Sequence, residues 1–174
     1  MLKGTSFHLR LITEADLPVF AEQMRTIDNR GDYYPHMVYS PVEIRRQFEK
    51  NGYWDDKSGI LLIVGDAGAI IGQIEFFEVV DYWSAFEISY LLYDQAERGK
   101  GIVTESVNLL VRYLFENRMV NRLQLAIHPE NVPSLRVAEK CGFTHEGTAR
   151  GAWYNKGRYH DMEIFSILRG EVLG

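Results

Sequence analysis

The sequence contains very little cysteine and no long apolar run. Cys141 is the one cysteine among 174 residues, so no disulfide can form within the chain. The apolar stretch 59–71 is interrupted by Asp66 and is too short to span a bilayer. Residues 1–13 carry Lys3 and Arg10 and lack the apolar core of a signal peptide. We therefore expect a soluble cytoplasmic protein with no membrane partner.

Basic charge and metal-ligand patterns are also scarce. The chain has 19 Lys and Arg against 24 Asp and Glu, and the net charge of −5 argues against nucleic acid as its main partner. The five histidines are scattered without ligand spacing, so no metal is expected. Repeats, low-complexity tracts and evident linkers are missing. The length and the 46% hydrophobic content therefore predict one domain, residues 1–174, with a substantial core.

The periodicity of apolar residues and the turn signals predict an ordered series of strands and helices. Asp16 is expected to cap a helix starting at Leu17, and Ser40 with Glu43 reads as the capping box of a second helix. The other expected elements are strands at Phe7–Leu11, Ile60–Val64, Ala69–Val79, Ala85–Tyr93, Leu123–Ile127, Phe143–Gly151 and Tyr159–Leu168, and helices at Thr104–Asn117 and Val132–Lys140. This order indicates an α+β fold with a mixed sheet.

The most informative segment is a glycine-rich loop between an expected strand and an expected helix. Residues 95–104 read Gln-Ala-Glu-Arg-Gly-Lys-Gly-Ile-Val-Thr. A helix N-terminus offers unpaired N–H groups and partial positive charge, which suit a phosphate. Gly99 and Gly101 leave those groups open, and Arg98 and Lys100 add positive charge at the rim.

Two common phosphate-binding motifs do not fit this loop. A Walker A motif requires Ser or Thr after Gly-Lys, whereas Lys100 is followed by Gly101. A dinucleotide fingerprint requires a third glycine, whose place is taken by Thr104, and a parallel βαβ start. A plain strand-to-helix turn, with glycines for geometry alone, is the simpler alternative.

A second motif decides between these readings. Asn131-Val-Pro-Ser134 opens a helix that closes with Glu-Lys-Cys-Gly142-Phe143. Together with Arg98-Gly-Lys-Gly101-Ile-Val103, this segment resembles the GNAT acetyltransferase superfamily, and within it the RimJ/RimL-like branch. The motifs lie in residues 87–168 of the chain, and the order of elements agrees over nearly all of it. Val103 departs from the family pattern, because Gly or Ala is usual there.

The resemblance implies a GNAT fold, in which a central, mixed, mostly antiparallel sheet is flanked by helices. Two parallel strands, here Ala85–Tyr93 and Leu123–Ile127, would splay apart around the pantetheine arm of acetyl-CoA. Ordinary sheet pairing is the alternative. The implied cofactor-binding residues are Leu91, Leu92, Tyr93, Arg98, Gly99, Lys100, Gly101, Ile102, Val103, Thr104, Asn131 and Ser134. Asn131 is also a natural helix cap, and both roles are compatible.

Two residues are predicted to be catalytic. The tyrosine that many GNAT enzymes use as general acid falls on Ala138 here, so Ser134 is the remaining hydroxyl on that helix. RimJ/RimL-like members use a serine at the matching place, which favours Ser134 as the donor to sulfur; support of the helix start is the alternative. Glu87 stands where GNAT enzymes carry a base or water-orienting glutamate, although a surface strand residue is also consistent with the sequence.

The acceptor side shows an acidic bias. Residues 66–97 hold seven acidic side chains and no Lys, Arg or His, which would attract a cationic amine. A hairpin centred on Asp81 would pair Glu75 with Glu87, and the repulsion would raise one pKa toward that of a base. A one-residue slip removes that pairing. Tyr33 and Tyr34 are expected to shape the substrate site beside these carboxylates.

The predicted function is acetyl-CoA-dependent N-acetylation of a primary amine by direct attack. The resemblance implies a protein N-terminal amine as acceptor. A polyamine of the spermidine type is the alternative, which the acidic segment suits. A non-catalytic acyl-CoA-binding regulator is a third reading, because Val103 and the missing tyrosine depart from the family pattern. Cys141 is expected to be a core residue, and His128 is a secondary candidate for proton relay. The acceptor and oligomeric state stay open, a homo-oligomer included.

Overall fold

In the computed structural model, a single eight-stranded sheet forms the centre of the protein. Residues 1–174 are described, except for the side chains of residues 28 and 29. The strands follow the spatial order β1-β2-β3-β4-β5-β6-β8-β7. Their bounds are Leu2–Lys3 (β1), Phe7–Leu11 (β2), Ser58–Gly65 (β3), Ile70–Glu78 (β4), Ala85–Leu92 (β5), Arg122–Ile127 (β6), Thr144–Asn155 (β7) and Arg158–Leu168 (β8). The expected α+β class with a mixed sheet is confirmed.

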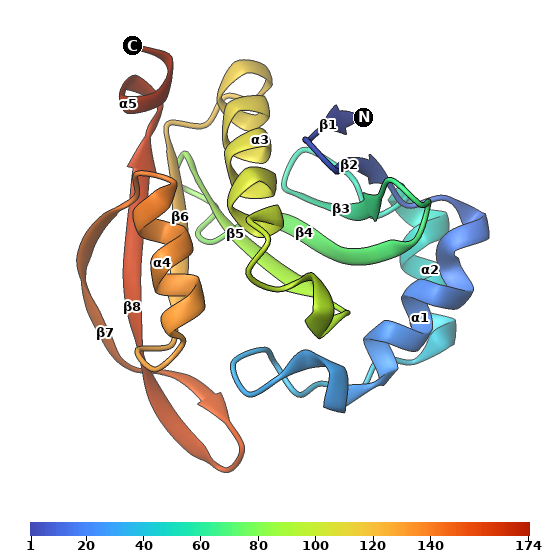
Figure 1. The fold of residues 1–174 in the computed structure, drawn as a ribbon. Coiled ribbons are helices and arrows are strands. Elements are labelled where there is room, and N and C mark those ends of the chain that lie inside the picture. Colours follow the sequence, from blue (N-terminus) through green and yellow to red (C-terminus); the bar gives the residue numbers. More distant parts are fainter.

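Helices cover both faces of this sheet (Figure 1). They are α1 (Leu17–Arg25), α2 (Pro41–Asn51), α3 (Ile102–Asn117), α4 (Val132–Lys140) and α5 (Arg169–Leu173), with short 3₁₀ turns at Glu14–Asp16, Ile27–Arg30 and Gln95–Glu97. One core joins α3 and α4 to the sheet, and a second joins α1 and α2 to β3. Within the described residues, none of these helices is long and apolar enough to cross a bilayer.

The continuous apolar run of β3 is explained by burial on both faces. Leu61 and Ile63 belong to the core beneath α3, whereas Leu62 and Val64 belong to the core beneath α1 and α2. Successive side chains of a strand point to opposite faces, so a central strand covered on both sides needs no polar alternation. The strand extends beyond the predicted Ile60–Val64 because its ends pair with β2 and β4.

The predicted caps of the first two helices are wrong, although these helices begin where expected. Asp16 does not cap α1; its carboxylate binds the guanidinium of Arg10 and the backbone and hydroxyl of Thr13. This ion pair holds the pKa of Asp16 well below its usual range. Ser40 precedes α2 without a side-chain cap bond, and Glu43 instead pairs with Arg46.

The register of the β4–β5 hairpin differs from the prediction. Glu75 pairs with Ser89, and Glu87 pairs with Phe77, because the turn is centred one residue later than expected. A shift of the turn by one residue displaces each partner by two positions. Both glutamates therefore stay on the same face of the sheet, as diagonal rather than direct neighbours.

The C-terminal hairpin is longer than the predicted strands, which ended at Gly151 and began at Tyr159. β7 continues to Asn155 and turns through Lys156 and Gly157 into β8. Irregular pairing between Ala149 and Trp153 bends this hairpin. β1 and α5 were not predicted, because each is too short to show a hydrophobic period.

Candidate active site

A gap opens in the sheet between β5 and β6. These neighbours are parallel and pair only from Ala85 to Glu87, against Arg122 to Gln124. Beyond Glu87 the strands diverge, while β5 stays paired with β4 and β6 stays paired with β8. The predicted splayed pair is therefore present.

The backbone groups that face this gap follow from the ladder with β4. Tyr93 N–H donates to the Ile71 carbonyl at 2.9 Å, and the Leu91 carbonyl points at Gly72. Because backbone groups alternate along a strand, Leu92 and Tyr90 turn theirs toward the gap. Of the three residues predicted to bind the pantetheine arm, Leu92 alone has free backbone groups on that side.

The glycine loop ends at the N-terminus of α3, which begins at Ile102 rather than at Thr104. Gly99 and Gly101 have φ values of 78° and 82°, a region that favours glycine. A Cβ built on either would meet nothing within 4 Å, so open space lies before the first turn of the helix. Lys100 pairs with Glu97 at 3.0 Å on the rim. The loop thus leaves room for a phosphate at the N–H groups of Ile102 to Thr104.

On the other side of the gap, Asn131 caps α4. Its Oδ1 accepts the backbone N–H of Ser134 at 3.3 Å, as the sequence predicted. The Ser134 side chain is therefore not the cap, and it lines a cavity between the two diverging strands.

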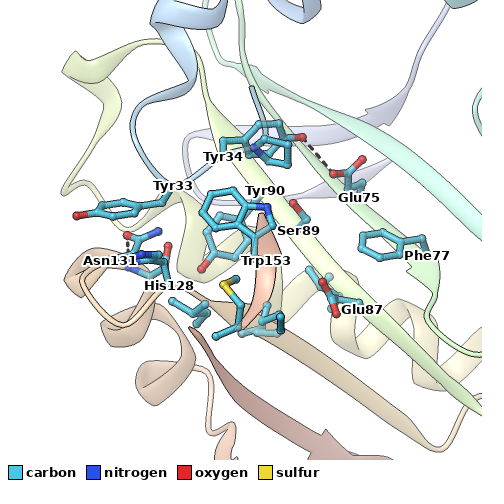
Figure 2. Close-up of a pocket in the computed structure, with 18 of the residues that line it drawn as sticks. Tyr33, Tyr34, Glu75, Phe77, Glu87, Ser89, Tyr90, His128, Asn131 and Trp153 are labelled. Atoms are coloured by element: carbon cyan, nitrogen blue, oxygen red, sulfur yellow. Dashed lines mark hydrogen bonds between the residues drawn. The ribbon is translucent and has the colours of Figure 1, made fainter. Parts of the chain in front are cut away.

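This cavity has a volume of about 630 Å³ and collects residues from distant parts of the chain (Figure 2). It brings together Tyr33, Tyr34, Glu75, Glu87, Asn131 and Ser134, all of which the sequence singled out. Its lining does not include Arg98 to Thr104, which stay at the start of α3. Its lining includes four residues that sequence reasoning missed, Phe77, Ser89, Tyr90 and Trp153. They come from strand positions that carry no distinctive sequence signal.

Two carboxylates give the cavity its charge. Burial raises the pKa of Glu75, and hydrogen bonds from Tyr34 and Ser89 oppose the rise. Burial also raises the pKa of Glu87, against a hydrogen bond from Gln124 at 2.8 Å and with a smaller contribution from Glu75. The described residues that line the cavity include no Lys or Arg. Among the described lining residues, the charge of the cavity therefore comes from these two carboxylates and is negative when they are ionised.

A chain of hydrogen bonds leads to Glu75. Tyr93 donates to Gln73 Oε1 at 2.5 Å, Gln73 donates to Tyr34 at 3.4 Å, and Tyr34 donates to Glu75 Oε1 at 3.2 Å. Every donor points toward the carboxylate (Figure 2 shows the last bond). This polarity favours the ionised form of Glu75 and opposes the effect of its burial.

Residues 31–39 form a strap along one wall of the cavity. Arg30, which is buried, anchors the strap through the carbonyls of Pro35 at 2.9 Å and Met37 at 2.7 Å. Asp32 pairs with Lys156 of the β7–β8 turn at 2.6 Å, and Tyr33 stacks on His128 with ring centroids 4.9 Å apart. The strap and the hairpin tip are thus tied together beside the site.

His128 takes part in this link rather than standing alone. Its Nδ1 accepts the backbone N–H of Glu130 at 3.2 Å, so its Nε2 carries the proton that is donated to His160 Nδ1 at 3.0 Å. His160 Nε2 then donates to the Asn155 carbonyl at 3.2 Å. Burial lowers the pKa of His128, with a smaller contribution from His160.

Comparison with known proteins gives one consistent result. The family model described as the acetyltransferase (GNAT) domain matches residues 6–144. A probable N-acetyltransferase of Bacillus subtilis, YjcK, is 29% identical over 97% of both chains.

Solved structures agree in fold. Spermidine N-acetyltransferase from Vibrio cholerae, in complex with CoA and spermine, has a TM-score of 0.85 at 22% identity, covering 98% of this chain and 100% of that one. RimL, a ribosomal L7/L12 α-N-protein acetyltransferase in complex with coenzyme A, has a TM-score of 0.77 at 24% identity over 95% of each chain.

Proposed function

Because the chain belongs to the GNAT acetyltransferase family, we propose that it transfers an acetyl group from acetyl-CoA to a primary amine by direct attack. The observation that carries the proposal is the cavity in the β5–β6 gap, which joins Glu75 and Glu87 on one side to Ser134 on the other. A carboxylate base and a hydroxyl donor facing one space are the groups that amine acylation requires.

The residues present fit acetyl-CoA. The open space before Gly99 and Gly101 suits a pyrophosphate at the start of α3, and the unpaired edge of β5 at Leu92 suits the amides of the pantetheine arm. When bound, acetyl-CoA supplies an activated acyl thioester. Of the other residues predicted for this role, Asn131 lines the cavity, whereas Arg98, Lys100, Ile102, Val103 and Thr104 lie in the glycine loop and the first turn of α3. Val103 is half-buried against the core, so its side chain is directed away from the open space.

Glu87 is proposed as the base. Its carboxylate lines the cavity and is held by Gln124, and burial raises its pKa toward the range in which a carboxylate accepts a proton efficiently near neutral pH. It would take the proton that the amine loses as the new carbon–nitrogen bond forms. Ser134 is proposed to donate a hydrogen bond to the departing sulfur.

Direct attack is supported by the state of Cys141. Burial raises the pKa of this thiol to about 11, and its Sγ lies against the Thr104 carbonyl at 3.5 Å. A thiol of that kind is a poor nucleophile. Initial-rate patterns that intersect would support a ternary complex, whereas parallel lines would indicate a covalent intermediate on the enzyme.

For the acceptor we place a polyamine ahead of a protein N-terminal amine. An N-terminal amine brings one positive charge, whereas two carboxylates with no Lys or Arg in the described lining suit a dication. In this arrangement Glu87 contacts the reacting amine and Glu75 the distal ammonium. Tyr33 and Tyr34 provide aromatic walls, which favour an alkyl ammonium chain.

A panel of acceptors tests the proposal. We expect the N-acetylated product from spermidine or a short diamine, with a KM well below that for peptides with a free N-terminus. Glu75→Gln should raise the KM for the diamine much more than the KM for a monoamine. A lower KM for peptides would favour the protein N-terminal acceptor. CoA binding without product from any amine would favour the non-catalytic regulator.

A further inference from the structure

Tyr90 has a buried hydroxyl group that no well-formed hydrogen bond from the described residues satisfies. Its hydroxyl oxygen is shielded from solvent and makes no hydrogen bond of normal length and angle with the residues that the structure describes, while the Ser134 side chain is close enough to interact with it weakly. The other two buried atoms of this kind, Arg30 Nε and Ser106 Oγ, belong to residues outside the cavity lining. By contrast, the hydroxyls of Tyr34, Tyr53 and Tyr93 each donate a hydrogen bond. A buried polar group usually has a partner, so this one is positioned for a partner from outside the chain.

The position of Tyr90 matches the point where the strands separate. It lies on β5 three residues beyond Glu87, the last residue paired with β6. Its neighbours Ile88 and Leu92 on the same face belong to the core beneath α3, and Tyr90 packs against that core. Its side chain therefore lies on the helix-covered face of the sheet, whereas Glu75 and Glu87 lie on the opposite face.

Ser134 approaches the same point from α4. Both residues line the cavity, in which Figure 2 also labels Asn131, the cap of α4. Burial raises the pKa of Tyr90 to about 12, and a weak hydrogen bond with the Ser134 side chain opposes that rise. The phenol thus keeps its proton at neutral pH. No base among the described residues accepts its hydrogen bond.

We propose that Tyr90 is a further catalytic residue and that its hydroxyl, together with that of Ser134, forms a two-donor site for the sulfur of the departing thiolate. The inference rests on the proposed acetyl transfer. As the carbon–nitrogen bond forms and the carbon–sulfur bond breaks, the electron pair stays on sulfur and the amine proton goes to Glu87. The two hydroxyls stabilise the negative sulfur, which takes its proton from solvent after release.

The test compares Tyr90→Phe with Tyr53→Phe, whose hydroxyl donates to the Ile44 carbonyl in the other core. The readout besides activity is the pKa of the CoA thiol in the binary complex, followed by thiolate absorbance against pH. Tyr90→Phe should raise that pKa by about one unit, a tenfold change in the thiolate ratio, and Ser134→Ala should do the same. Affinity for desulfo-CoA should not change.

Stability separates this role from a structural one. Tyr90→Phe removes a buried hydroxyl that lacks a well-formed hydrogen bond, so the melting temperature without ligand should hold or rise, while Tyr53→Phe should lower it. A destabilised Tyr90→Phe with an unchanged thiol pKa would overturn the proposal. If the variant does not fold, the tyrosine difference spectrum of the wild type decides: identical spectra with CoA and desulfo-CoA would also overturn it. Failure to bind either ligand would instead refute the proposed function.

Discussion

At the scale of single residues, the site depends on two glutamates that are alike in burial and differ in their partners. Glu75 receives a tyrosine hydroxyl at the end of a directed chain, and Glu87 receives an amide from Gln124. An amide donor holds a carboxylate in place without supplying a proton, so Glu87 stays available as a base. These partners could not be predicted from the sequence, because they join β4, β5, β6 and the strap.

Glu87→Gln should lower kcat by about a hundredfold or more at neutral pH while leaving acetyl-CoA affinity nearly unchanged. The raised pKa of Glu87 means that its carboxylate becomes competent only as pH rises through that value, so wild-type kcat should increase there and then level. The variant should lack this rise and recover part of its rate at high pH, where the amine deprotonates by itself. A wild-type pH profile in the variant would exclude Glu87 as the base.

Glu75 should make the ligand-free protein less stable as pH rises. Its pKa is higher in the folded state than in the unfolded chain, so the folded state holds more protons between the two values. The stability that Glu75 contributes is fully present at pH values below its pKa in the unfolded chain, and it is lost as the pH rises through its raised pKa in the folded state. Glu75→Gln should flatten the dependence, which denaturant unfolding at several pH values can measure. An equally steep dependence in the variant would assign it to other groups.

At the scale of elements, the N-terminus of α3 and the β5–β6 gap are the two parts proposed to hold the cofactor. The sequence predicted both, because a glycine loop and a strand order leave local and topological signals. It misplaced the start of α3 by two residues, since Ile102 and Val103 read equally well as loop or helix. The predicted β4–β5 register was wrong for a different reason. The turn between Val79 and Ser84 has no Asn-Gly or Asp-Gly pair that would fix its length.

Gly101→Asp should weaken acetyl-CoA binding at least about tenfold, a loss of about 1.4 kcal/mol, because a carboxylate would compete with phosphate at the start of α3. Gly52→Asp is the matched control: Gly52 ends α2 with a φ of 63° and open space around it, so it bears the same backbone strain away from the site. Both variants should lose similar stability, and calorimetry should show weaker binding in the first alone. Equal affinities would refute the phosphate-loop assignment.

At the scale of the whole molecule, the two cores lie on opposite faces of the sheet, and we expect each face to hold one of the two substrates. The α3 and α4 face carries the glycine loop, Tyr90 and Ser134, whereas the α1 and α2 face carries Glu75 and Glu87. The gap between β5 and β6 connects the two faces of the sheet. Sequence motifs predicted the glycine loop and the Asn131 cap on the α3 and α4 face, because both are local features. In the cavity they predicted Glu75 and Glu87 but missed Trp153 and Phe77, which come together through long-range packing.

The net charge of −5 and the acidic segment 66–97 should attract a cationic acceptor over some distance. The KM for a diamine should therefore increase as salt rises from about 0.01 M to about 1 M, over which the Debye length falls from about 30 Å to about 3 Å. The kcat should change little, since the buried carboxylates are poorly screened. A neutral acylation probe, hydroxylamine, is the control; a salt-independent KM for the diamine would contradict the electrostatic contribution.

The one-sided pairing of β5 has a consequence for hydrogen exchange. Amides of Leu91 and Tyr93 are held in the ladder with β4, whereas those of Tyr90 and Leu92 face the gap without a partner strand. The rate of amide exchange with deuterium should therefore alternate between slow and fast at successive residues of β5, although this strand lies in the middle of the sheet. A ligand whose amide carbonyls accept hydrogen bonds in the gap would slow exchange only at the fast positions. Ligand binding could therefore be followed residue by residue along β5, even if the backbone conformation does not change.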